Sequence, residues 1–356
     1  GQLSNPYAFD YHRPMRHNAA QRFTHTFSIY EADQFPPRYC GRMFALNPIE
    51  HCIPLCEITP DGSSRQTHDL GDVVRPSASD QADWFTPVDI QIGPDGALYI
   101  ADWNSAQANH YHSHEGQIDP TIGRIYRMRE REYSPSKPVD LAALTSNELV
   151  EQCLRDPNRW RRQQARRVLG DRRDPAIGAR LWDLVRLNDD QLALEGLWAL
   201  EVSIGVDDRQ LQAALAHSNA DVRGWAIQLI ADRDSLAPES GAALLALAKN
   251  ETMAEVRCRL ASAAKRLPAA YGVPIAFELS RRHEDASDVY LPRAIWWALE
   301  AHADRRDLIS AELHDADNWR SAIQVAGLTM PQCLMKRWAL GGRDDDPLHR
   351  ARRVAG

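Results

Sequence analysis

The chain has 356 residues, 44% of them hydrophobic and 26% charged, with a formal net charge of −7 at pH 7. This composition supplies enough apolar residues for a core, and the length predicts two domains or one long repeat array. No apolar run approaches the roughly 18 residues that span a bilayer, so no transmembrane segment is predicted. The acidic balance argues against nucleic acid as a main partner.

Residues 84–103 predict two short strands joined by a tight turn. Val88, Ile90 and Ile92 alternate with polar residues, which is the period of a half-buried strand. The turn follows at 93–96 as Gly-Pro-Asp-Gly, and residues 98–103 return as Leu-Tyr-Ile-Ala-Asp-Trp. A strand, a tight turn and a second strand of this kind are typical of a β-propeller blade, whose strand ends surround a ligand channel.

The strand patterns extend only from about residue 23 to 128, which is enough for roughly two blades. A closed propeller needs at least four blades, and two blades alone would leave sheet edges exposed. The sequence also begins at Gly1 without an initiator methionine or a signal peptide. We therefore expect a fragment of a longer protein, in which residues 1–135 form the C-terminal part of a propeller.

Residues 136–356 predict an α-solenoid of HEAT-like helix pairs. Helical patterns at 157–169, 189–202, 219–230, 253–264 and 288–302 recur with a period in the low thirties, and about six helix pairs are expected. The phrase Asp-Val-Arg at 221–223 returns as Glu-Val-Arg at 255–257. The acidic residue is favourable near the N-terminus of a helix, where it interacts with the helix dipole, and the arginine is expected to pair with the equivalent acidic residue of the next repeat. The predicted fold class is thus multidomain β plus α.

The tryptophans and the paired arginines of the helical half are interpreted as structural residues. Tryptophans recur at helical spacing, and we interpret them as packing between stacked helices. They are Trp160, Trp182, Trp198, Trp225, Trp296, Trp297 and Trp319. The two arginine pairs at 161–162 and 166–167 are interpreted as a solvated face, with a docking patch as the alternative.

The cysteines give little sign of a metal or haem site. Cys52 and Cys56 lie close together beside His51, but no second ligand pair with zinc spacing follows them. The chain contains no Cys-x-x-Cys-His, so it carries no haem attachment motif of the c type. Nicotinamide or ATP chemistry is likewise unsupported, because no Gly-rich phosphate loop is present.

Short sequence motifs occur in a characteristic order at 23–25, 29–30, 41–44, 60–62, 84–89, 93–103, 123–127, 140–144, 156–160 and 296–300. Taken together, this order resembles one protein family, the membrane-bound dehydrogenases of planctomycetes and verrucomicrobia. Members of that family join a propeller similar to quinoprotein glucose and sorbosone dehydrogenases to HEAT-like repeats, and many end in a cytochrome c domain.

The resemblance implies an exported protein, periplasmic or at the cell surface, that oxidises a sugar or polyol hydroxyl. The implied cofactors are pyrroloquinoline quinone (PQQ) and calcium, used together with a histidine base. The base and most calcium ligands would belong to earlier blades. Many members carry arginine where this chain has Thr86, which leaves the quinone contact at this position without its charge.

The densest polar constellation is a histidine-rich stretch at residues 109–114. His110, His112 and His114 alternate, so on an extended segment they project from one side. With Asp102 or Asp119 they would bind a metal or act as an acid–base pair, and the alternative is a solvated surface loop.

Three roles are therefore expected near the strand ends. His110 and His112 are the predicted catalytic residues. His51, Thr86 and Asp102 are predicted to bind the cofactor, and the predicted metal ligands are His110, His112, His114 and Asp119. The predicted function is that of a sugar or polyol oxidoreductase fragment with the helices as a docking scaffold for a protein partner. The alternative is a non-enzymatic binding module for a glycan or a partner protein.

Overall fold

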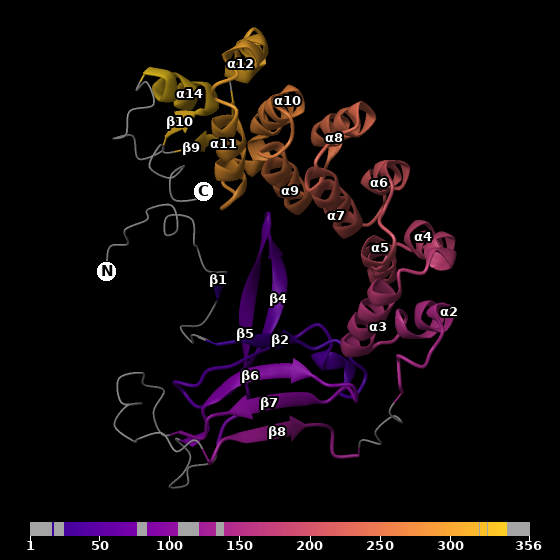
Figure 1. Ribbon diagram of the computed structural model, residues 1–356. Helices are drawn as coiled ribbons and strands as arrows, with labels where there is room; N and C mark the ends of the chain where they lie inside the picture. Colours follow the sequence, from indigo (N-terminus) through magenta and orange to yellow (C-terminus); the bar gives the residue numbers. More distant parts are fainter. Residues whose placement is uncertain are drawn as a thin grey trace.

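The computed structural model describes residues 16–17, 25–76, 84–105, 121–132, 139–319, 321–325 and 327–339. Within these ranges an antiparallel-sheet region is followed by a helical repeat region of 13 α-helices (Figure 1). The strands of the sheet region are β1 (Arg16–His17), β2 (Phe27–Ile29), β3 (Met43–Ala45), β4 (Ile53–Asp61), β5 (Ser64–Val74), β6 (Pro87–Ile92), β7 (Leu98–Asp102) and β8 (Arg124–Met128).

The first sheet has the strand order β1-β5-β4-β3-β2. Strands β2 to β5 form an antiparallel meander, and the short β1 pairs in parallel with the outer strand β5. The longest element is the hairpin β4–β5, which projects from the sheet toward the helices (Figure 1). Its turn contains Gly62 at a φ of 60°, a backbone conformation that glycine adopts without strain.

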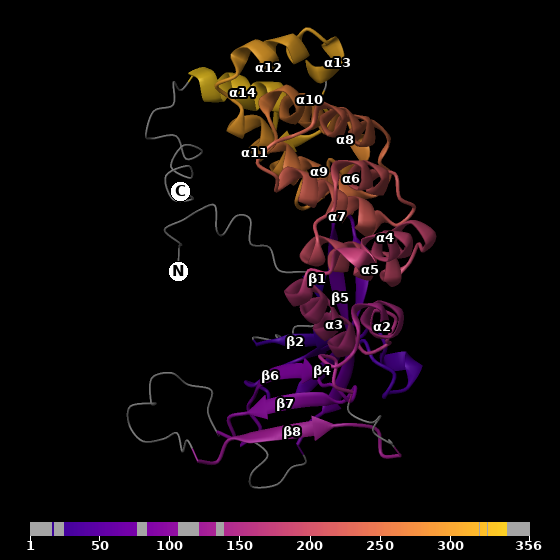
Figure 2. The same ribbon diagram turned by 45° about the vertical axis from the view of Figure 1, so that its right-hand side comes forward.

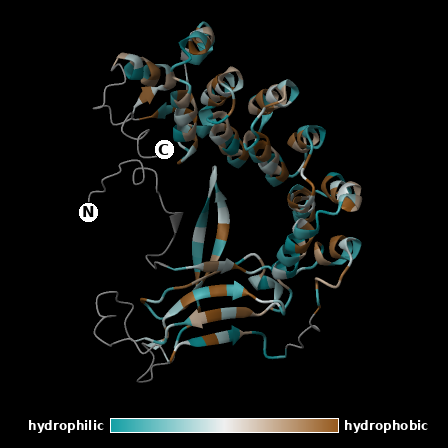
Figure 3. Ribbon diagram, viewed as in Figure 1, coloured by the Kyte–Doolittle hydropathy of each residue, from teal (hydrophilic) through white to brown (hydrophobic). Residues whose placement is uncertain are grey.

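The second sheet has the order β6-β7-β8, and it confirms the predicted strand, turn and strand at residues 87–102. Ile92 pairs with Leu98, and Ile90 pairs with Ile100, so the apolar side chains share one face. Hydrophobic and hydrophilic bands accordingly alternate along these strands in Figure 3. The buried face packs against aromatic residues of the first sheet, Tyr30 and Phe44 among them.

The helices form two rows (Figures 1 and 2). The inner row, which faces the hairpin β4–β5, consists of α3 (Arg159–Arg172), α5 (Gln191–Ser203), α7 (Ala220–Ala231), α9 (Ala254–Ala264) and α11 (Leu291–Ala301), each in contact with the next. The outer row consists of α4 (Gly178–Leu187), α6 (Asp208–Leu215), α8 (Pro238–Asn250), α10 (Ala269–Ser280) and α12 (Arg306–Leu313). The remaining helices are α2 (Ser146–Glu148), α13 (Ala316–Trp319) and α14 (Met330–Ala339).

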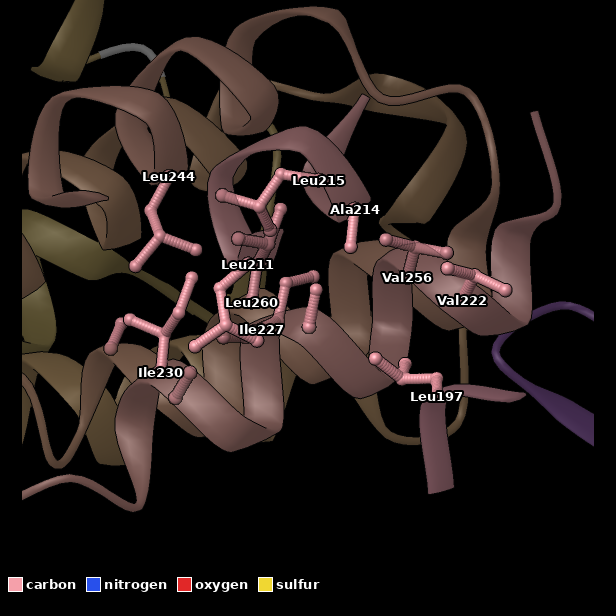
Figure 4. Close-up of a cluster of buried hydrophobic side chains, with 14 of the residues drawn as sticks. Leu197, Leu211, Ala214, Leu215, Val222, Ile227, Ile230, Leu244, Val256 and Leu260 are labelled. Carbon is pink, nitrogen blue, oxygen red and sulfur yellow. The ribbon is translucent and has the colours of Figure 1, made fainter. Parts of the chain in front are cut away.

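One apolar core runs between the two rows of helices (Figure 4). Leu211 and Leu215 of α6 are buried with Ile227 of α7, Leu244 of α8 and Leu260 of α9. Each helix alone buries only one stripe, so the repeats depend on their neighbours for stability. Trp296 is fully inside this core, and the other tryptophans of the helical half whose side chains are described pack against it, which confirms their structural interpretation.

Arginines of the inner row lock successive repeats together. Arg223 donates to both carboxylate oxygens of Glu251 at 2.7 and 2.8 Å, and also to two carbonyls of the loop before its own helix. The predicted partner was wrong, because Glu255 is the acid equivalent to Asp221 and Glu251 lies four residues before it. The same arrangement recurs in the pairs Arg162–Glu195 and Arg257–Asp285.

The sheets are joined to the helices at two places. Near α3, the Asn158 amide donates to the carbonyl oxygens of Gly93 and Pro94, so the β6–β7 turn sits against the first inner helix. At the far end of the hairpin, Ser63 donates from its backbone and its hydroxyl to the carboxylate of Asp288, at 2.7 and 2.6 Å. The sheets therefore brace the helices at two places, through the β6–β7 turn at α3 and through the tip of the hairpin β4–β5 just before α11 (Figure 1).

The structure differs from the sequence-based expectations at Arg162 and near the end of the described chain. The solvated-face interpretation was wrong for Arg162, which is buried between Glu31 and Glu195. A two-stranded sheet of β9 (Gln324–Val325) and β10 (Leu328–Thr329) before α14 was not foreseen.

Among the described helices, none combines the length and the apolar character required to cross a bilayer. The predicted domain boundary at 135 falls within 133–138, which the structure does not describe.

Candidate functional site

Three strand termini meet at the end of the second sheet that points away from the helices. Because β6, β7 and β8 are antiparallel, the start of β6, the end of β7 and the start of β8 lie side by side (Figure 1). Five residues of these termini and of the β3–β4 turn are in contact, and we call them the strand-end cluster. They are His51, Phe85, Thr86, Asp102 and Asn104.

Asp102 organises the cluster. Its side chain is 3% exposed, and Oδ1 accepts hydrogen bonds from the backbone N–H groups of Thr86 at 2.7 Å and Asn104 at 2.8 Å. Asn104 has a φ of 51°, a left-handed conformation that asparagine tolerates better than most residues. The carboxylate thus holds the chain in place as it leaves β7 and enters β6.

Thr86 is fully buried, and its hydroxyl is used within the cluster. It donates to the backbone carbonyl of Ser105 at 2.5 Å, while the Thr86 carbonyl accepts from the N–H of Trp103 at 3.1 Å. The hydrogen-bonding groups of Thr86 and one oxygen of Asp102 are therefore committed to the backbone around them. A cofactor-binding role for these two residues stays a prediction. The side-chain oxygen that remains for such a role is Oδ2 of Asp102, which is buried and has no hydrogen-bond partner among the described residues.

His51 has one ring nitrogen fixed by the backbone. Its Nδ1 lies 2.9 Å from the carbonyl oxygen of Phe85, and a carbonyl can only accept, so Nδ1 carries the proton. A neutral His51 then presents Nε2 as a hydrogen-bond acceptor. The residue sits in the β3–β4 turn at a φ of 56° and is only partly buried.

A cleft of about 520 Å³ adjoins the strand-end cluster. It lies between the end of β5 and the second sheet, and its walls carry aromatic rings and guanidinium groups. It is lined by Val74, Pro76, Trp84, Phe85, Ile100, Asn104, Arg124, Tyr126, Arg127, Met128 and Arg129. The rings of Phe85 and Tyr126 stand edge to face at 5.9 Å.

The charge in this cleft is one-sided. Three arginines line it, and none of the described lining residues is an aspartate or a glutamate. Arg127 forms an ion pair with Asp95, whereas Arg124 donates to the hydroxyl of Tyr126 at 3.3 Å. Together with the partly exposed rings of Trp84 and Tyr126, the guanidinium groups favour an anionic ligand with a flat apolar surface.

The structure brings together three of the predicted site residues, namely His51, Thr86 and Asp102. His110, His112, His114 and Asp119 lie outside the described residues, so their predicted catalytic and metal-binding roles stay predictions. The described chain stops at Ser105 and resumes at Thr121, and Asn104 and Arg124 near these two points both line the cleft.

A metal site receives no support from the described part of the chain, in which no group of three or more His, Cys, Asp or Glu side chains is arranged to hold an ion. Burial raises the pKa of Cys52 to about 12 and that of Cys56 to about 11, which disfavours the thiolate form that binds metals.

A family model matches residues 3–132 of the chain. Its description reads "Domain of unknown function (DUF7133)". No curated protein and no solved structure matches the chain. The matched segment spans the sheet region, including the strand-end cluster and the cleft, and the description of the family assigns no activity to it.

The cleft arginines were missed as site residues in the sequence. The segment 123–127 attracted attention only as a motif, although four arginines, Arg124, Arg127, Arg129 and Arg131, lie within the eight residues of a strand and its exit. That excess of one charge on a short strand is the signal that would have found them.

Proposed function

We propose that the chain is part of an exported oxidoreductase, periplasmic or at the cell surface, that acts on sugar or polyol hydroxyls and holds PQQ in the strand-end cleft. In this proposal the sheets are the last blades of a propeller and the helices are a HEAT-like solenoid that docks a protein partner. The observation that carries the cofactor assignment is the lining of the cleft, with three guanidinium groups, three aromatic rings and no carboxylate.

The chemistry of this lining fits a flat anionic quinone. Arg124 and Arg129 would pair with its carboxylates, and the rings of Trp84 and Tyr126 would lie against its ring system. When bound, PQQ supplies the acceptor for the hydride removed from the hydroxyl-bearing carbon. Among the described residues no group of His, Cys, Asp or Glu is arranged to hold calcium, and the proposal leaves the calcium ligands to the earlier blades and to the predicted ligands outside the described residues.

His51 is suited to hold the substrate proton. Because Nδ1–H donates to the Phe85 carbonyl, the ring is fixed in the tautomer that leaves Nε2 able to accept a proton from a hydroxyl. His110 and His112 remain the other proposed bases. Replacing both by Ala in the protein with its earlier blades, and measuring dye-linked sugar oxidation and bound metal, tests them directly.

The cofactor assignment is tested by titrating the purified chain with PQQ and following tryptophan fluorescence. We expect saturable quenching that Arg124→Gln with Arg129→Gln weakens by about tenfold or more, since each lost charge-assisted bond contributes roughly 1.5–3 kcal/mol in a desolvated site. Arg131→Gln is the matched control, because Arg131 is exposed and does not line the cleft. Absence of quenching, or equal quenching in all variants, would refute the assignment.

The second candidate is a non-enzymatic binding module for a glycan or a partner protein. The commitment of the Thr86 hydroxyl and backbone groups to internal hydrogen bonds favours it, because Thr86 then has little left for a cofactor. The two candidates differ in turnover. If the protein with its earlier blades binds ligand in the cleft but reduces no dye with any sugar or polyol, the binding module is correct.

A further inference from the structure

A second cavity lies between the inner helices α3, α5 and α7 and the loop that follows β2. Its volume is about 420 Å³, within the range of small-molecule sites, and such sites are frequent at domain junctions. It is lined by three inner helices and by Glu31, which lies in the loop between β2 and β3. The lining residues are Glu31, Arg159, Arg162, Gln163, Arg166, Gln191, Glu195, Trp198, Glu201, Val202, Trp225 and Leu229.

The spacing of these residues shows that the cavity is a feature of the helix faces. On α5 the lining residues 191, 195, 198 and 202 follow one another at three or four positions, as do 159, 162 and 166 on α3. The cavity wall is therefore formed by continuous stripes along the helices, and their packing in the inner row holds it in shape.

The charges around the cavity cancel one another. Arg162 pairs with Glu31 at 2.5 Å and with Glu195 at 2.9 Å, and Arg166 approaches the second oxygen of Glu195 at 3.3 Å. With Arg159 and Glu201 the lining holds three cations and three anions. An ionic ligand would have to displace one of these pairs, whereas a neutral ligand leaves them in place.

Aromatic rings form the apolar part of the wall. Trp198 and Trp225 meet edge to face at 5.5 Å, and both side chains are partly exposed. The Arg166 guanidinium lies 4.7 Å from the Trp198 ring centre. At the mouth, the exposed side chain of Gln163 offers an amide donor and acceptor, and that of Gln191 offers its carbonyl oxygen while its amide nitrogen donates to Oε1 of Glu195 at 3.0 Å.

We propose that this cavity binds a neutral sugar ring or a short neutral oligosaccharide. A pyranose has an apolar C–H face that packs on indole rings, and its hydroxyls both donate and accept, which matches the glutamine amides and the paired ions around the rings. The site is independent of the function proposed above, since it shares no residue with the strand-end cleft.

The test uses the whole chain and three neutral disaccharides, maltose, cellobiose and N,N′-diacetylchitobiose, in saturation-transfer NMR and calorimetric titrations. We expect at least one of them to bind with a Kd on the order of 1 mM, and glucuronate and acetate not to compete. Trp225→Ala is expected to lower the affinity about tenfold or more. Trp182→Ala, which removes an indole from the outer helix α4, is the matched control and should bind as the wild type does.

Because loss of a partly buried tryptophan can disturb folding, the double variant Gln163→Ala with Gln191→Ala provides a second test. Both side chains are exposed, and the hydrogen bond from Gln191 to Glu195 is one of several that Glu195 receives, so thermal unfolding should change little while sugar affinity falls several-fold. The proposal fails if no neutral disaccharide gives a saturable signal. It also fails if the glutamine variant binds like the wild type, or if glucuronate displaces the sugar.

Discussion

Replacing Asp102 by alanine should loosen the ends of β6 and β7. The wild-type carboxylate accepts two hydrogen bonds from buried backbone N–H groups, those of Thr86 and Asn104, at 2.7 and 2.8 Å. Alanine removes the acceptor and leaves both donors without it. Because the two donors belong to the entry of β6 and the exit of β7, the loss falls on the strand-end cluster.

The size of the effect follows from these two bonds. A hydrogen bond to a charged group contributes roughly 1.5–3 kcal/mol, so Asp102→Ala should cost about 3 kcal/mol or more of unfolding free energy. That is a large part of the roughly 5–15 kcal/mol that stabilises a typical domain. Asp102→Asn keeps a neutral acceptor at the same position and should cost about 1 kcal/mol.

Urea unfolding followed by tryptophan fluorescence measures the loss, since Trp84 and Trp103 lie beside the cluster. Hydrogen exchange at the Thr86 and Asn104 amides locates it. If Asp102→Ala unfolds at the wild-type urea concentration and both amides keep their protection, the structural role given to Asp102 is refuted. If stability is retained but PQQ binding is lost, Asp102 acts on the ligand.

Three further outcomes are expected. Burial raises the pKa of Asp288, but hydrogen bonds from Ser63 and from nearby backbone outweigh it and hold the pKa below its usual range. This carboxylate therefore stabilises the fold above its unfolded pKa of about 3.9, and the contribution is lost as the pH falls through the lower folded value. The protection factor of the Ser63 amide, which is its intrinsic exchange rate at a given pH divided by the observed rate, should fall on that descent, and an unchanged protection factor in acid would contradict the contact between Ser63 and Asp288. Arg257→Ala should lower the free energy of unfolding in urea by about 3–5 kcal/mol, because it leaves the buried Asp285 carboxylate without its ion-pair partner. A loss below about 1 kcal/mol would contradict the role of this ion pair in holding successive repeats together. Of the six cysteines only Cys40 is exposed, so native protein at pH 8 should react quickly with one equivalent of a thiol reagent, and rapid reaction of more would show that the buried thiols are accessible.

Much of the local structure could be predicted from the sequence, because its causes lie within a few residues. The alternation at 88–92 and the Pro-Asp-Gly turn predict a hairpin from local sequence alone, and the structure contains that hairpin, with Ile90 opposite Ile100. Asn158 and Asn219 accept hydrogen bonds from the first turns of α3 and α7, at the helix starts that the pattern predicted. The helical period also indicated a repeat region, since each unit repeats the same pattern.

The pairings between distant segments were decided only by the tertiary structure. Arg223 meets Glu251 instead of the equivalent acid Glu255, because the offset between stacked helices sets which side chains are within reach. The same limit applies to the two cavities. The strand-end cleft combines Val74, Trp84 and Arg124, which come from three strands or their ends, and nothing in a short window of sequence records their proximity. Periodicity specifies which face of an element is apolar, whereas the packing of whole elements determines which polar groups come together between them.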